Sequence, residues 1–212
     1  MESQILYLFD PLCGWCYGFS DTIHRFSQKY QKKYEFVPIP GGMVVDQRVQ
    51  PISEIKEYIA GSIPRVEEMT GCEFGEAYKN GLLQSGTTMM NSEPPSRALI
   101  TFRTFRLDES MAYARALQKS HYFYGKDYNE TDWYGDLAEE FGIAKKPFLQ
   151  RFSEKKMKQH VQEEFAWVRE SGVQGYPTVV VRKGSKYYML SNGYVPLEQL
   201  ETTLAKAEQK IK

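Results

Sequence analysis

Two of the three cysteines stand three residues apart, in the segment Cys13-Gly14-Trp15-Cys16. Positions three apart in a helix lie on neighbouring faces, close enough for a disulfide, whose Cβ atoms are about 3.8 Å apart. The pair therefore predicts dithiol chemistry, in which one sulfur attacks a disulfide and the other resolves the resulting mixed disulfide. A zinc site is the alternative for paired cysteines. Zinc takes four ligands, and neither Cys72 nor the histidines form a second ligand pair, so we expect no metal.

The place of the two cysteines at the start of a predicted helix assigns their roles. Free N–H groups and the positive end of the helix dipole stabilise a thiolate, so Cys13, on what we expect to be an exposed first turn, is the predicted attacking sulfur. Cys16 begins the apolar stripe of the helix and is the predicted resolving thiol. Two inert buried cysteines are the other interpretation, which the position of Cys13 before the stripe disfavours. Cys72 is interpreted as a small buried side chain.

A second motif, Gly172-Val173-Gln174-Gly175-Tyr176-Pro177-Thr178, places a proline directly before an apolar run. Proline donates no backbone hydrogen bond and is confined to strand ends, edges and bulges. A proline at the entry of a predicted strand therefore indicates a specific role for the turn that precedes it.

The elements around the first motif follow the order strand, helix, strand. Residues 4–9 are an apolar run of strand length, which Asp10 and Pro11 interrupt. Residues 34–37 form the next predicted strand. Between the two strands, apolar residues recur at spacings of three and four on one side of a helix, at Cys16, Phe19, Ile23, Phe26 and Tyr30. This order implies a right-handed parallel βαβ unit.

Later segments divide into a helical part and a returning β part. Between residues 51 and 152 the pattern predicts short helices and no strand. The next helix has Ser153 placed as its N-cap and Gly172 as its C-cap. Residues 178–181 and 187–190 then predict a β-hairpin, and a final amphipathic helix covers the C-terminal residues.

The fold class that these elements predict is α/β, with two segments of one domain separated by an insertion. Residues 1–50 and 153–212 are expected to form the domain that holds both motifs. Residues 51–152 are expected to form an all-helical insertion domain.

Composition excludes several classes of partner. The 212 residues carry 27 Lys and Arg against 27 Asp and Glu, without long runs of one sign, so we expect no nucleic-acid partner. No stretch approaches the roughly 18 apolar residues of a membrane span, and the N-terminus lacks the pattern of a secretory signal. An odd number of cysteines fits a reducing compartment. These features predict a cytoplasmic protein without a membrane association or structural disulfides.

The two motifs together resemble those of the thioredoxin superfamily, and in particular its DsbA-type branch, in which a helical domain interrupts a thioredoxin fold. The order of elements in this chain is similar. The resemblance to a bacterial group of DsbA-like protein-disulfide isomerases covers nearly the whole chain and is carried by three stretches, which are Asp10 to Gly18, Asn91-Ser92-Glu93-Pro94 with Arg97-Ala98, and Gly172 to Thr178. It implies a thioredoxin fold with an all-helical insertion.

The same resemblance implies a redox-active centre and its residues. Cys13 and Cys16 are implied to be catalytic, with Pro177 as a cis-proline that faces both sulfurs. Trp15 and Tyr176 are the residues we expect to contact the substrate. The implied activity is that of a thiol-disulfide oxidoreductase or disulfide isomerase acting on protein or small-molecule disulfides. That cycle requires no metal or organic cofactor, and glutathione is suggested as a co-substrate only by the related transferases.

Two departures and two alternatives accompany this resemblance. The periplasmic DsbA oxidants have Pro-His between the cysteines, whereas this chain has Gly14-Trp15, so we expect a less oxidising couple. Kappa-class glutathione transferases and 2-hydroxychromene-2-carboxylate isomerases share the fold but have serine at the position of Cys13. A glutathione-dependent isomerase or transferase is therefore one alternative function, and a non-enzymatic DsbA-like adaptor is the other.

Overall fold

A four-stranded sheet forms the centre of the computed structural model, which describes residues 3–211. Its strand order is β2-β1-β5-β6, and β1 pairs parallel with β2 and antiparallel with β5. The strands are β1 (Ser3–Phe9), β2 (Glu35–Pro40), β5 (Thr178–Lys183) and β6 (Lys186–Asn192). The predicted βαβ unit and hairpin are therefore present, and β5 and β6 are antiparallel as expected.

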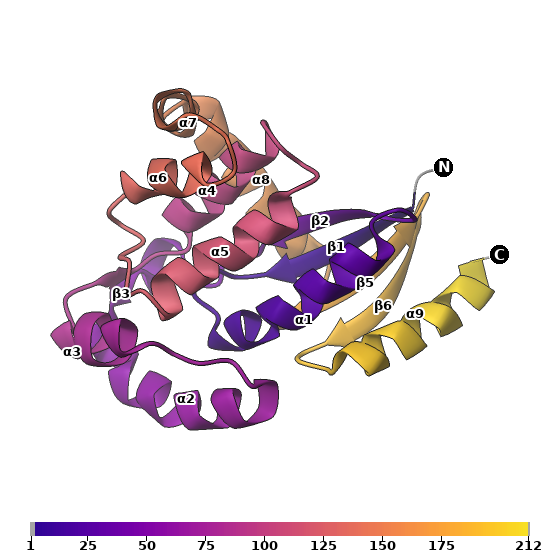
Figure 1. The fold of residues 1–212 in the computed structure, drawn as a ribbon, viewed down its shortest axis with the longest axis horizontal. Helices are drawn as coiled ribbons and strands as arrows, with labels where there is room; N and C mark the ends of the chain where they lie inside the picture. Colours follow the sequence, from indigo (N-terminus) through magenta and orange to yellow (C-terminus); the bar gives the residue numbers. More distant parts are fainter. Residues whose placement is uncertain (1–2, 212) are drawn as a thin grey trace.

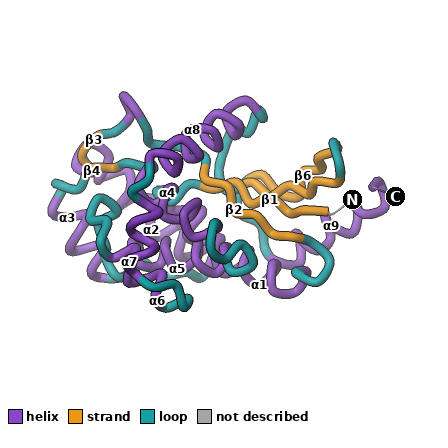
Figure 2. Tube along the Cα trace, turned by 90° about the horizontal axis from the view of Figure 1, so that it is seen from above, coloured by secondary structure: helices purple, strands orange, loops and turns teal. Residues whose placement is uncertain are grey.

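Nine α-helices accompany the sheet within the described residues. They are α1 (Gly14–Tyr30), α2 (Lys56–Thr70), α3 (Leu83–Ser85), α4 (Glu93–Arg103), α5 (Ser110–Tyr122), α6 (Trp133–Glu139), α7 (Lys145–Phe152), α8 (Lys155–Glu170) and α9 (Leu197–Ile211). Figure 2 shows α8 on one side of the sheet and α1 with α9 on the other. Within the part described, no helix combines the length and apolar character needed to cross a membrane.

Strand β1 is buried on both faces because helices cover both sides of the sheet. Its side chains alternate between two clusters: Ile5, Tyr7 and Phe9 belong to the main core, whereas Leu6 and Leu8 pack in a second cluster that includes Val168 of α8. A strand covered on both faces carries a continuous apolar run rather than an alternating one. This arrangement fixes the end of β1, from which the first cysteine motif departs.

The helices between residues 51 and 152 gather at one end of the sheet, at the left of Figure 1. Helix α5 packs against α1 and β2, while α4 packs against α8. The main buried cluster includes Phe19 of α1 together with Leu99 and Leu117 from these helices. The helical insertion therefore shares a hydrophobic core with the sheet, and it can orient residues beside the cysteine motif.

Two details of the predicted secondary structure are wrong. The prediction of no strand between residues 51 and 152 fails because β3 (Gln50–Pro51) and β4 (Met89–Met90) form a short antiparallel ladder. Ser153 does not cap α8, since its hydroxyl donates to the carbonyl of Leu149 in the preceding helix. Gly172 does follow the end of α8 with a φ of 75°, the left-handed conformation that glycine adopts easily.

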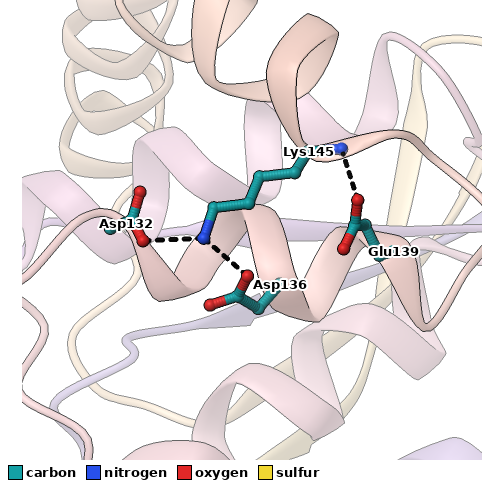
Figure 3. A network of polar contacts seen from close by, with 4 residues as sticks. All are labelled: Asp132, Asp136, Glu139 and Lys145. Atoms are coloured by element: carbon teal, nitrogen blue, oxygen red, sulfur yellow. Dashed lines mark hydrogen bonds and ion pairs between the residues drawn. The ribbon is translucent and has the colours of Figure 1, made fainter.

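An exposed polar network joins α6 and α7 within the insertion (Figure 3). The Nζ of Lys145 lies 2.7 Å from the carboxylate of Asp132 and 2.6 Å from that of Asp136. The backbone N–H of Lys145 also donates to the side chain of Glu139. These contacts fasten the first turn of α7 to α6 at the surface.

Candidate active site

Cys13 is the N-cap residue of α1, because the chain turns from β1 into the helix at this position. Its sulfur accepts a hydrogen bond from the backbone N–H of Cys16 at 3.3 Å. An N-cap side chain that accepts from the third helical residue satisfies an otherwise free donor, and here that side chain is a sulfur. The arrangement favours negative charge on Cys13.

The expected exposure of Cys13 is wrong, since only 7% of the residue is accessible. Instead of lying on an open first turn, it is covered by the loop that carries Tyr176, whose carbonyl oxygen is 3.7 Å from the sulfur. Cys13 nevertheless lines a cavity, described below, through which a small or extended substrate can approach.

Cys16 lies beneath Cys13 and is fully buried. Burial raises the pKa of its thiol well above the ordinary value, and hydrogen bonding and charge at Cys13 act in the same direction. The hydroxyl of Tyr7, a buried residue of β1, donates to the carbonyl of Cys16 at 3.3 Å. The two cysteines are therefore chemically unequal: one borders a cavity, whereas the other is held as a neutral thiol in the core.

The loop before β5, which is distant in the sequence, covers Cys13. The Tyr176–Pro177 peptide bond is cis, the geometry that the resemblance implies. The hydroxyl of Tyr176 donates to the carbonyl of Gly41 at 3.0 Å. Gly41 leaves room for that ring, because a Cβ at this position would collide with the Tyr176 side chain.

The cavity beside Cys13 has a volume of about 430 Å³, within the usual range for small-ligand sites. Its wall combines the loop after β2, one side of α8 and the Tyr176 loop. Two cations, Arg48 and Arg169, and one carboxylate, Asp46, line it together with the apolar ring of Phe165. The guanidinium of Arg48 is held in place because it donates to the carbonyl of Gly42 at 3.1 Å.

Asp10, the residue directly after β1, connects three segments around the motif. Its carboxylate accepts from the backbone N–H of Leu12 at 2.9 Å, which is the local turn contact expected for an Asp at this place. It also accepts from the N–H of Met43 at 2.7 Å and the hydroxyl of Ser92 at 2.8 Å. The cysteine loop, the cavity loop and the entry to α4 thus meet at one buried side chain.

Of the remaining predicted site residues, only Tyr176 lines the cavity beside Cys13. Trp15 is half-buried and packs against the main core. Cys72 was expected to be buried, but it is only half-buried, in a cleft with Tyr17 and Arg115, because the chain leaves α2 through Gly71 there. Across residues 3–211, no group of three or more metal-binding side chains comes together.

Several site residues carry no signal in the sequence. Arg48, Arg169 and Phe165 reach the cavity only through the tertiary fold. The pair Gly41-Gly42 is a local signal in the sequence, since adjacent glycines after a strand often permit a close approach by another segment. At Gly42, where φ is 68°, a Cβ would lie 2.7 Å from the ring of Phe165.

Comparisons with known proteins agree with this geometry. A family model described as the DSBA-like thioredoxin domain matches residues 4–205. A protein from Nitrosomonas europaea, provisionally described as a protein disulfide isomerase, superposes with a TM-score of 0.87 at 25% identity, covering 99% of both chains. No match was found among curated proteins.

Two further proteins, represented by three structures, share the fold. The cytosolic disulfide reductase DsbM from Pseudomonas aeruginosa superposes with a TM-score of 0.82 at 25% identity over 98% of both chains. The same reductase was also solved with GSH, and that structure superposes with a TM-score of 0.79. A 2-hydroxychromene-2-carboxylate isomerase shares the fold at 16% identity, with a TM-score of 0.65 over 97% of this chain and 96% of that one.

Proposed function

The chain belongs to the DSBA-like thioredoxin domain family, and we propose that it is a thiol-disulfide oxidoreductase acting through Cys13 and Cys16. Members of this family are generally oxidoreductases or isomerases, and the similar structures include a protein described provisionally as a disulfide isomerase and a disulfide reductase. The observation that carries the proposal is the sulfur of Cys13 at the N-cap of α1, hydrogen-bonded to the N–H of Cys16 and bordering a cavity.

In the first step, the Cys13 thiolate attacks one sulfur of a disulfide substrate. A bond forms between Cys13 and that sulfur, the substrate disulfide breaks, and the second substrate sulfur leaves as a thiolate. The helix start supports the attacking charge through the N–H of Cys16. The carbonyl of Tyr176 faces the same sulfur, so an extended peptide can pair with this loop in the manner of an added strand.

In the second step, Cys16 resolves the mixed disulfide. Its proton leaves to solvent, its sulfur bonds to Cys13, and the substrate departs as a thiolate. The dithiol has then become a disulfide, and an external thiol must reduce it to complete a reductive cycle. Net reduction of the substrate therefore requires a second thiol compound.

We propose glutathione as that thiol compound. It carries two carboxylates and one ammonium group, and the cavity beside Cys13 offers Arg48 and Arg169 for the former and Asp46 for the latter. The volume of about 430 Å³ is compatible with a tripeptide. The DsbM structure with GSH, at 25% identity, supports the same assignment.

We further propose that the protein works as a reductant in the cytoplasm. The dipeptide Gly14-Trp15 supplies no imidazolium to stabilise the reduced thiolate, so the couple is expected to lie below the roughly −120 mV of DsbA. The relative at 25% identity is described as a cytosolic disulfide reductase, which fits that direction.

A glutathione redox titration tests the proposal. The protein is equilibrated at a series of GSH to GSSG ratios, alkylated, and mapped by mass spectrometry. The expected product is a Cys13–Cys16 disulfide with a potential below that of DsbA, and Cys72 should stay a thiol throughout. A chain that forms no such disulfide at any ratio would refute the dithiol function.

Cysteine variants distinguish the alternative functions. A glutathione-dependent isomerase or transferase would keep its activity in Cys16→Ser, because those reactions need no resolving thiol. An adaptor would bind a partner with both cysteines replaced. The dithiol function instead predicts that Cys16→Ser accumulates a mixed disulfide between Cys13 and glutathione.

A further inference from the structure

Tyr176 forms one side of the approach to Cys13. Its carbonyl oxygen is 3.7 Å from the Cys13 sulfur, and its side chain lines the cavity beside that sulfur. The ring reaches across to the loop after β2, where its hydroxyl donates to the carbonyl of Gly41 at 3.0 Å. A single side chain therefore joins the two loops that border the reactive sulfur. We call this contact the Tyr176–Gly41 bridge.

Both ends of the Tyr176–Gly41 bridge are held by backbone hydrogen bonds. The N–H of Gly41 donates to the carbonyl of Phe9, the last residue of β1, at 2.8 Å. On the other side, the carbonyl of Pro177 accepts from the N–H of Gly193 at 2.7 Å. The bridge therefore spans two segments that are each fastened to the sheet, and it forms a fixed part of the cavity wall.

The contact between the Tyr176 ring and Gly41 leaves no room for a side chain at position 41. A Cβ at Gly41 would lie 2.0 Å from the hydroxyl oxygen of Tyr176 and 2.1 Å from its Cζ atom, so the ring would have to move. The two residues are therefore matched. Closing the wall in this way requires a large ring on one loop and bare backbone on the other.

This closed wall leaves Cys13 recessed. Only 7% of Cys13 is accessible, whereas Cys72, which has no part in the dithiol cycle, is half-buried. Exchange requires the attacking sulfur to come within about 3–3.5 Å of the disulfide in a defined orientation. A small disulfide can enter the cavity of about 430 Å³ and meet this requirement. A disulfide held in a folded protein carries a surrounding surface, which would collide with the bridge first.

We propose that the Tyr176–Gly41 bridge makes Cys13 selective for low-molecular-weight disulfides over disulfides held in folded proteins. This inference rests on the proposed dithiol function and names its substrate class. The charged side chains that line the cavity, Arg48, Arg169 and Asp46, suit small polar substrates. The bridge acts through access alone. For either class of substrate, the Cys13 thiolate bonds to one substrate sulfur and the other sulfur leaves as a thiolate.

The test compares two disulfides in a single turnover without glutathione. The reduced protein is mixed with an excess of bis(2-hydroxyethyl) disulfide or of insulin, and samples are quenched by alkylation and mapped by mass spectrometry. The Cys13–Cys16 dithiol is oxidised to a disulfide while the substrate disulfide is reduced to two thiols, which gives a second-order rate constant for each substrate. Tyr176→Ala should raise the rate constant for insulin. The ratio of the insulin constant to the small-disulfide constant should rise about tenfold, the low end of what one side chain contributes to discrimination.

Two further variants separate access from reactivity. Tyr176→Phe keeps the ring but removes its hydrogen bond, so the ratio should rise about threefold. Gly41→Ala keeps Tyr176 but displaces its ring, so it should also raise the rate constant for insulin. A change in the reactivity of the Cys13 sulfur alone would multiply both rate constants by the same factor and leave the ratio unchanged.

The matched controls come from α2. Tyr58 is 77% exposed, and a Cβ at Gly61 would meet no atom within 4 Å. Tyr58→Ala and Gly61→Ala should therefore leave both rate constants at their wild-type values.

The outcomes distinguish this inference from the proposed function. If Tyr176→Ala and Gly41→Ala both keep the wild-type ratio, the bridge does not select substrates, while the dithiol cycle stands. If one of the two variants does not fold, the ratio in the other decides. A wild-type chain in which neither disulfide oxidises Cys13 and Cys16 would overturn both the selectivity and the dithiol function.

Discussion

Aspartate carboxylates lie in two contrasting environments in this molecule. Asp10 is buried and accepts from three neutral donors, without a cation at ion-pair distance. Asp132 and Asp136 share the ammonium group of Lys145, and their side chains are 79% and 60% exposed (Figure 3). Counting ion pairs would rank the exposed region as the more strongly held.

Solvent reverses that ranking. Water and salt screen an exposed ion pair, and the loss of one partner exposes the other to water at little cost. In the interior, a donor or acceptor left without a partner keeps its full desolvation penalty. We call the buried contacts of Asp10 with Leu12, Met43 and Ser92 the Asp10 junction. This junction should therefore affect both the free energy of unfolding and disulfide exchange, while the exposed network around Lys145 should affect neither strongly. The following predictions test this contrast in order of decreasing effect.

Replacing the cavity-facing sulfur should have the largest effect. Cys13→Ser should abolish disulfide exchange, because a serine hydroxyl remains protonated and is a far weaker nucleophile than a thiolate. Turnover of a disulfide substrate with glutathione measures this. Cys72→Ser is the matched control, since Cys72 lies in a different cleft, and it should retain wild-type turnover. Equal losses in both variants would contradict the assignment of Cys13.

The buried histidine His121 should dominate the loss of folding stability at acid pH. His121 stacks on Tyr128 with ring centroids 4.1 Å apart, and its Nδ1 lies 2.8 Å from the carbonyl of Lys126. Burial lowers its pKa to about 4 from 6.5, against opposing contributions from that carbonyl and from Asp127. The neutral ring therefore stabilises the fold fully above pH 6.5, and this contribution is lost as the pH falls through 4.

The loss corresponds to roughly 3 kcal/mol in the free energy of unfolding. Urea unfolding at a series of pH values should show it in the wild type. His121→Gln should flatten the change between pH 6.5 and 4, whereas His160→Gln, on the exposed side of α8, should preserve it. An unchanged acid response in His121→Gln would show that other groups cause it.

The sequence predicts the elements of this fold better than its junctions. Strand β1, helix α1 and the β5–β6 hairpin follow from local periodicity, which burial on one or both faces imposes on neighbouring residues. The β3–β4 ladder was missed because each strand has two residues, too few for a pattern, and its pairing depends on distant segments.

The residues of the candidate site also fall into two groups, those that belong to sequence motifs and those that only the tertiary fold brings there. Cys13, Cys16 and Pro177 belong to short motifs and could be selected from the sequence. Arg48 and Ser92 could not be placed beside them, because loop closure and the orientation of α4 decide where those side chains point. The expected exposure of Cys13 failed for the same reason, since the covering loop is 163 residues away in the chain.

Removing the buried hydroxyl of Ser92 should lower the free energy of unfolding more than removing the exposed hydroxyl of Ser153. Ser92→Ala leaves the N–H of Val44 without its side-chain partner and removes one of the two donors to an oxygen of the buried Asp10 carboxylate, so we expect a loss of about 1–3 kcal/mol. Ser153→Ala removes an exposed hydroxyl that donates to Leu149, and should stay within about 0.5 kcal/mol of the wild type. Chemical denaturation of both variants measures the difference. Equal costs would remove the distinction between buried and exposed polar contacts.

The cavity cations should have an intermediate effect that is confined to binding. Arg48→Ala should raise the KM for glutathione about two- to fivefold with little change in kcat, because a partly solvated charge pair contributes up to about 1 kcal/mol. Arg65→Ala, which removes an exposed cation from α2, is the control and should leave KM unchanged. A fall in kcat without a change in KM would place Arg48 in the chemical step instead.

The smallest effect should come from the most conspicuous ion-pair network. Lys145→Met removes the ammonium group shared by Asp132 and Asp136, yet leaves both carboxylates open to water. Hydrogen bonds to Asp132 and Asp136 raise the pKa of Lys145 to about 12, so any stabilisation it provides is complete below pH 10.5 and is lost as the pH rises through 12. At neutral pH the variant should unfold at the same temperature as the wild type, at both low and high salt, and should retain full disulfide exchange. A clear drop in the unfolding temperature that vanishes at high salt would show that the surface network contributes to stability, and the contrast with Asp10 would then rest on chemistry alone.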